Sequence, residues 1–156
     1  MENYKEYLLQ LATAFAGSLG FAMLFHVRRE KLLLASLGGL LAWGVYLLAG
    51  IWWTEDVVRY FASAVTLTIY GETMARVVKC PATLFIVTAS IPLIPGGSLY
   101  HTMKFFMEGK FDAFSQQGLH TVLLAVAIAV GILFPTSIFR LVQQARCQRA
   151  ASRKSV

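Results

Sequence analysis

The sequence predicts an all-α fold, a polytopic membrane helix bundle with five transmembrane spans, of which the fourth is discontinuous. Of the 156 residues, 57% are hydrophobic and only 14% are charged, whereas about a quarter of the residues in soluble domains are charged. The apolar residues form stretches of about 20 residues, the length that crosses a ~30 Å hydrocarbon core. One stretch holds two prolines and two glycines near its middle. This composition excludes soluble globular, disordered and disulfide-rich proteins.

The apolar stretches place the spans in order along a single integral membrane domain, residues 1–156. The connections between them are short and polar. The N-terminus is of mixed charge and the first apolar run is long, so a retained span is expected rather than a cleaved signal peptide. The expected spans are about 7–27, 32–53, 57–78, 82–107 and 118–142, with a basic tail over 143–156.

The basic residues divide unequally between the two faces that five spans create. Ten of the 14 Lys and Arg residues fall on the face that carries the C-terminus. The positive-inside rule then places the N-terminus outside and the C-terminus in the cytoplasm, with the chain in the cell inner (plasma) membrane. The net charge of +6 is thus a signal of orientation and does not indicate nucleic acid. The other face carries Lys5, Arg59, Lys104 and Lys110.

Neither a metal site nor an enzyme is indicated by the reactive side chains. Cys80 and Cys147 match no metal-ligand spacing, and we expect both to be free thiols. His26 and His101 have no second His or Cys one helical turn away, so metal binding is not indicated. The sequence holds no Ser/His/Asp set, carboxylate pair or phosphate loop. We therefore expect no cofactor.

Small residues recur at spacings of four along three of the expected spans. Such stripes allow two helices to approach closely in lipid. They indicate packing within a bundle rather than a binding site. The stripes are Ala12, Ala16 and Gly20, then Ala35 and Gly39, then Ala127 and Gly131.

The fourth span is predicted to break near the middle of the membrane. Pro92 and Pro95 remove helix donors and clash with the preceding turn, and two glycines follow. The ten residues before the break give about 15 Å of helix, half of the ~30 Å core. Ser98 is expected to cap a second half-helix. Freed amides at such a terminus attract carboxylates. The expected substrate site comprises Thr88, Ser90, Pro92, Pro95, Gly96, Gly97, Ser98 and Tyr100. A simple kink, or a loop leading to an interfacial helix, is the alternative.

A polar stripe runs down the third span at helical spacing and is expected to face neighbouring helices or water. Its members are Arg59, Ser63, Thr66, Tyr70 and Thr73. Glu72 precedes Arg76 by four residues, the favourable order for a helix ion pair. Two interpretations of this pair stay open, a structural ion pair and a role in proton or substrate coupling. Arg59, one turn from the outer end, fits an outer anchor better than a substrate clamp.

Several segments resemble the threonine/serine exporter family. They are residues 20–25, residues 75–83, and the most distinctive stretch, 91–96, with Tyr100 and Met103 after it. The length and the five spans resemble the short YjjB-type subunit, which is equivalent to the C-terminal half of the full-length exporter.

The resemblance implies export of small carboxylate-bearing metabolites, threonine and serine or a dicarboxylate such as succinate. It also implies a larger YjjP-type partner subunit, and five short helices are few to enclose a pathway alone. A homo-oligomer is possible as well. The competing interpretations are a non-transporting structural or assembly subunit of the membrane, and a homo-oligomeric channel that needs no partner.

Overall fold

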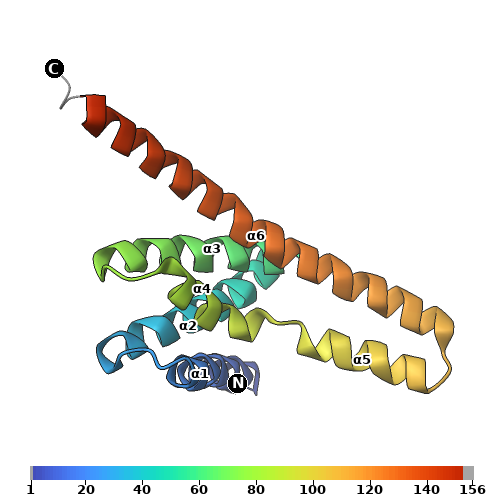
Figure 1. Ribbon diagram of the computed structural model, residues 1–156. Coiled ribbons are helices and arrows are strands. Elements are labelled where there is room, and N and C mark those ends of the chain that lie inside the picture. The colour runs from blue at the N-terminus through green and yellow to red at the C-terminus, as the bar shows by residue number, and fades with distance from the viewer. Residues whose placement is uncertain (1, 153–156) are drawn as a thin grey trace.

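Every regular element in the described part of the chain is helical, which confirms the predicted all-α class (Figure 1). The computed structural model describes residues 2–152, with side chains over 5–145. Cys80 is a free thiol, whereas the side chain of Cys147 lies outside the described ones. The elements are α1 (Glu2–Leu24), α2 (Arg29–Trp52), α3 (Asp56–Val77), α4 (Ala82–Ser90), the 3₁₀ helix η1 (Ile91–Leu93), α5 (Gly96–Met107) and α6 (Phe111–Ser152).

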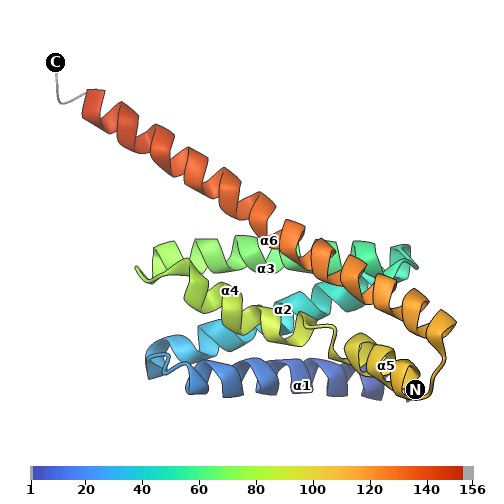
Figure 2. The same cartoon turned by 45° about the vertical axis from the view of Figure 1, so that its right-hand side comes forward.

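The helices α1 and α3 end with the same backbone motif. His26 and Lys79 adopt positive φ angles of 54° and 50° just after the last helical turns. The next amides reach back five residues, from Val27 to the Ala22 carbonyl and from Cys80 to that of Ala75. This is the Schellman pattern that terminates helices. Both turns lie at the same end of the bundle (Figure 2), where the chain reverses into α2 and α4.

Helix α2 packs between its neighbours through residues with little or no side chain. A Cβ added at Gly38 would lie 2.9 Å from the Ala89 Cβ of α4 and 3.1 Å from the Tyr70 ring of α3. A Cβ added at Gly39 would overlap the Ser18 hydroxyl of α1. Two apolar clusters continue this core, formed respectively by Ala42, Ala64, Leu67, Ile86, Ala89 and Leu93 and by Ala22, Val27, Ala35, Ala75 and Phe85.

The small-residue stripes were predicted correctly on α2 and α6 and wrongly on α1. Ala35, Gly39, Ala127 and Gly131 are buried. The stripe of Ala12, Ala16 and Gly20 is exposed instead, and nothing lies within 4 Å of a Cβ added at Gly20. The face of α1 that packs on α2 carries Ala14, Ser18 and Ala22, offset by two residues from the predicted stripe.

Helix α6 is longer than the predicted span 118–142. It begins at Phe111, directly after a tight turn, and continues to Ser152, through residues expected to form a polar loop and a tail. The turn is possible because Gly109 adopts a φ of +71°. Beside it, a 2.7 Å hydrogen bond from Lys110 lowers the pKa of the exposed Glu108 carboxyl. Helix α6 then crosses α3 and extends beyond the bundle (Figures 1 and 2).

The chain breaks between η1 and α5, where the two-proline pattern predicts a break. The segment Ala82–Leu93 and the helix Gly96–Met107 are bent by 49° relative to each other. After the bend, α5 packs against α6, with the Thr102 and Thr121 hydroxyls 3.2 Å apart. No residue of α5 is buried, so its face away from α6 is uncovered within the described chain.

By length and hydropathy, three helices of the described chain could cross a membrane, α1, α2 and α6. The bent pair Ala82–Leu93 and Gly96–Met107 gives a fourth candidate if both parts form one span. Helix α3 is long enough but is not among them, and it carries the polar stripe together with Glu72 and Arg76. The helix bounds agree with the five predicted stretches to within a few residues, except at the N-terminus of α1 and at both ends of α6.

The close approach of α1 and α2 predicts a compensating pair of substitutions. Gly39→Ala should destabilise the detergent-solubilised protein by about 1–3 kcal/mol because the new methyl group overlaps Ser18. Adding Ser18→Gly should restore part of that loss, since the nearest remaining atom is a Pro92 carbon at 3.4 Å. Thermal unfolding measures both, with Gly20→Ala as the control. Equal stability of Gly39→Ala and the parent chain would contradict the packing described.

Candidate functional site

The backbone around the break has irregular hydrogen bonding. The Ile94 amide donates to the Ile91 carbonyl at 3.2 Å, and the Gly96 amide donates to the Ile94 carbonyl at 2.7 Å. Pro95 is the N-cap residue of α5, and its carbonyl receives the first helical bond, from the Leu99 amide at 3.1 Å. The chain therefore leaves helical geometry over only two residues, fewer than the proline-glycine pattern predicts.

The prediction that Ser98 caps α5 is wrong. The helix begins at Gly96, so Ser98 is the third helical residue, and no side chain caps this end. Its carbonyl accepts a 2.8 Å bond from the Thr102 hydroxyl within the helix. The glycines at the break have no φ between +20° and +160°, and the helix begins two residues before Ser98, at Gly96.

The first turn of α5 presents free amides on an open face. Gly96 and Gly97 are exposed, and a Cβ added at either would meet no atom within 4 Å. The amides of Gly97 and Ser98 belong to the first helical turn, where no carbonyl within the helix is available. An anion could approach the Gly97 amide closely, because neither Gly96 nor Gly97 has a side chain that would block it.

The other residues predicted for the substrate site do not converge on the break. Thr88 is fully buried in α4, and its hydroxyl donates to the Leu84 carbonyl at 2.8 Å. The Ser90 hydroxyl donates to the Val87 carbonyl at 2.9 Å. Tyr100 is 65% exposed on α5. Of the predicted set, only Pro92 lines a pocket next to the break.

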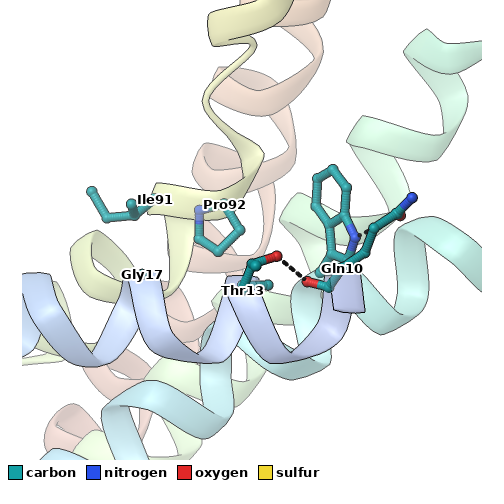
Figure 3. A pocket seen from close by; sticks show the side chains of 7 residues that line it. Gln10, Thr13, Gly17, Ile91 and Pro92 are labelled. Atoms are coloured by element: carbon teal, nitrogen blue, oxygen red, sulfur yellow. Dashed lines mark hydrogen bonds between the residues drawn. The ribbon is translucent and has the colours of Figure 1, made fainter. Parts of the chain in front are cut away.

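That pocket lies between α1, α2 and η1 and has a volume of about 210 Å³. Figure 3 shows its polar wall on α1, with Pro92 and Ile91 facing it from η1. The Thr13 hydroxyl donates to the Gln10 carbonyl at 2.9 Å, and the Trp43 indole donates to the Gln10 side-chain oxygen at 3.3 Å. Its lining residues are Gln10, Thr13, Ala14, Gly17, Trp43, Ile91 and Pro92.

A cluster of aromatic and charged groups supports Trp43 from behind. The Tyr46 ring stacks on Trp43 with the centroids 4.8 Å apart, and the Arg59 guanidinium lies 4.1 Å from the Tyr46 centroid. Asp56 accepts bonds from the Tyr46 hydroxyl at 3.1 Å and from Arg59 at 3.0 Å. Arg59 therefore joins α3 to Tyr46 of α2 and does not line the pocket beside the break. Its predicted place at the outer membrane face stays a prediction.

The polar stripe of α3 forms hydrogen bonds to α2 and within α3 itself. The Tyr70 hydroxyl donates to the Leu34 carbonyl of α2 at 2.7 Å, and Thr66 donates to its own helix at 2.9 Å. The Ser63 hydroxyl is fully buried and has no hydrogen-bond partner in the described chain, and the same is true of Ser18. Thr73 is exposed and bonds within α3. The stripe faces neighbouring helices at Ser63 and Tyr70, but Thr73 is exposed and does not.

Glu72 and Arg76 form the ion pair expected from their spacing, with a distance of 3.3 Å. The Glu72 side chain is only 12% exposed, whereas that of Arg76 is 44% exposed. The Arg76 guanidinium also lies 4.3 Å from the Phe139 ring centroid of α6. The pair therefore joins α3 to α6 and lies on a different face of α3 from Tyr70.

Sequence reasoning missed the α1 wall of the pocket and the cluster behind it. A signal was present, because Gln10, Thr13 and Gly17 follow one another at spacings of three and four in an otherwise apolar span. Trp43 and Tyr46 carry no comparable signal. Their role depends on the packing of α2 against α1 and α3, and the pattern within one span does not contain that information.

The family comparison covers most of the chain. Residues 10–138 match the family model described as Threonine/Serine exporter, ThrE. No curated protein and no solved structure gives a significant match. The matched range includes the pocket, the break and the Glu72–Arg76 pair.

The cluster behind Trp43 predicts different effects for two substitutions of one residue. Tyr46→Phe removes the hydrogen bond to Asp56 and should cost about 1 kcal/mol of stability. Tyr46→Ala also removes the ring and should cost clearly more, with a red-shifted Trp43 emission as its indole becomes less shielded. Unfolding and fluorescence, measured in a Trp52→Phe, Trp53→Phe background, separate the two effects. An unchanged emission in Tyr46→Ala would contradict the stacking.

Proposed function

The chain belongs to the threonine/serine exporter family, and on that premise we propose that it is a membrane subunit of a secondary transporter that exports small carboxylate-bearing metabolites. Threonine, serine and a dicarboxylate such as succinate are the candidate substrates. The observation that carries the proposal is the open turn at the start of α5, where the Gly97 and Ser98 amides are free. A substrate carboxylate would accept hydrogen bonds from these amides.

Five spans are proposed for the chain, α1, α2, α3, the bent pair α4–α5 and α6. The place of α3 in the bundle supports its role as a span, because it packs against α2, α4 and α6. Its polar groups at Ser63 and Tyr70 face the protein rather than lipid. The positive-inside rule places the N-terminus outside and the C-terminus in the cytoplasm of the inner membrane.

A partner is proposed because the break and the outer face of α5 are uncovered in a single chain. Within hydrocarbon, free amides must be buried in protein or line a wet cavity. A larger YjjP-type subunit would cover this side, and a second copy of the chain is the alternative. Substrate uptake by liposomes with this chain alone, compared with chain plus partner, distinguishes them. Efficient uptake with the chain alone would favour a homo-oligomeric channel or transporter.

The carboxylate site predicts that Gly97→Val blocks export without disturbing the fold. A Cβ added at Gly97 meets no atom within 4 Å in the described chain, so membrane level and unfolding temperature should stay unchanged. Loss of charge-assisted hydrogen bonds worth about 1.5–3 kcal/mol should lower the export rate by about ten- to 100-fold. Gly20→Val is the matched control, since that glycine also faces open space. Export at the parental rate by Gly97→Val would rule out the site.

If Glu72 couples export to protons, substitutions of Glu72 and Arg76 should have different effects on the pH dependence of export. Glu72→Gln should then flatten the dependence of the export rate on pH. Arg76→Gln breaks the same 3.3 Å ion pair and keeps the carboxyl, so it should preserve a pH dependence. Export assays from pH 5 to 8 in liposomes compare them. The structural interpretation predicts an unaltered pH profile and a loss of stability in both variants, larger in Arg76→Gln because that variant also loses the contact with Phe139.

A further inference from the structure

The pocket between α1, α2 and η1 is mainly apolar and carries a few uncharged polar groups. No Lys, Arg, Asp or Glu is among its lining residues. Its polar groups are the Gln10 amide, the Thr13 hydroxyl and the Trp43 indole, and its apolar wall includes Ile91 and Pro92. A carboxylate or an ammonium group would find no opposite charge here. The chemistry that fits is an uncharged polar group attached to a short apolar one.

The hydrogen bonds within the pocket leave a donor and an acceptor free. An indole N–H can only donate, so the Gln10 side-chain oxygen faces Trp43. The amide nitrogen then keeps two N–H donors, which no group in the described chain accepts. The Thr13 hydroxyl donates its one proton to the Gln10 backbone carbonyl, and its oxygen can still accept a hydrogen bond. A ligand hydroxyl both donates and accepts, and so matches this pair.

The size of the pocket favours a small ligand. Its volume of about 210 Å³ corresponds to about seven water molecules at ~30 Å³ each. Pockets for drug-sized ligands start at about 300 Å³. The space therefore suits the side chain or the whole of a metabolite with a few carbon atoms.

We propose that this pocket binds the uncharged, hydroxyl-bearing end of the exported metabolite. Gln10 and Thr13 are its specificity-determining residues, and Trp43 is a positioning residue that holds the Gln10 amide. The inference rests on the proposed export function and adds a second subsite to it. Pro92 belongs to the pocket wall, and Gly97 lies five residues further along the same broken segment.

Trp43 makes the binding directly observable without transport. The chain has three tryptophans, and Trp52→Phe with Trp53→Phe leaves Trp43 as the only one. This full-length variant in lipid nanodiscs is titrated with threonine and with valine, which has a methyl group in place of the hydroxyl. Malate and succinate form a second pair that differs by one hydroxyl. The hydroxyl-bearing member of a pair should change the Trp43 emission saturably and bind at least about tenfold more tightly.

Two substitutions test the assigned residues, each with unfolding temperature as the check on folding. Gln10→Leu and the isosteric Thr13→Val should each abolish the tenfold preference for the hydroxyl-bearing ligand. Gln116→Leu, at an exposed position of α6 outside the pocket, should keep that preference. The same preference should be measurable as competition for export in liposomes that contain the partner.

The outcomes separate this inference from the export function. Equal binding of threonine and valine, together with equal binding of malate and succinate, would overturn the pocket assignment. If Gln10→Leu and Thr13→Val export with an unchanged preference for the hydroxyl-bearing ligand, the pocket assignment is wrong and the proposed export function is unaffected. A hydroxyl-specific Trp43 signal without any export would support the pocket and contradict the exporter.

Discussion

A backbone amide or carbonyl that leaves a helix must find another partner, and this constraint governs the segment from Pro92 to Ser98. In the proposed five-span arrangement the segment lies within hydrocarbon, where such groups must be buried in protein or line a wet cavity. The prolines remove two donors, and the chain recovers helical geometry at Gly96 with a bend of 49°. The bend directs α5 away from the other helices, α1–α4, and α5 packs against α6. It leaves the first turn of α5 open, so the proposed site and the need for a partner have the same physical origin.

Close packing around the break fixes the geometry of the pocket. Gly39 brings α2 so near to α1 that the Ser18 hydroxyl is buried, and Pro92 lies beside them. At the N-terminal end of α3, Asp56 and Arg59 hold Tyr46, and the stacked Trp43 reaches Gln10. Polar groups of α3 are thereby used to build a scaffold, and the uncharged polar groups of α1 remain available to a ligand.

Local patterns in the sequence predicted what local chemistry determines. Hydropathy predicted helices, and the proline-glycine run predicted the break. The prediction that Ser98 caps α5 failed because helical geometry resumes at Gly96, two residues before the serine. The predicted length of α6 was too short. The residues at 111–117 are compatible with a helix, and Pro135, the proline inside α6, does not end it. The pocket needed tertiary information, since Gln10, Trp43 and Pro92 come from three separate segments.

The most direct test of the account is the solvent accessibility of the break in intact membranes. Gly97→Cys, placed in a Cys80→Ser, Cys147→Ser background together with the partner subunit, is treated with a membrane-impermeant maleimide. Gly20→Cys, on the exposed face of α1, provides the reference for an exposed helix position away from the break. The account predicts that Gly97→Cys is labelled from the aqueous phase and that added substrate slows the labelling. If Gly97→Cys is as unreactive as Gly20→Cys, the break does not line a wet substrate site.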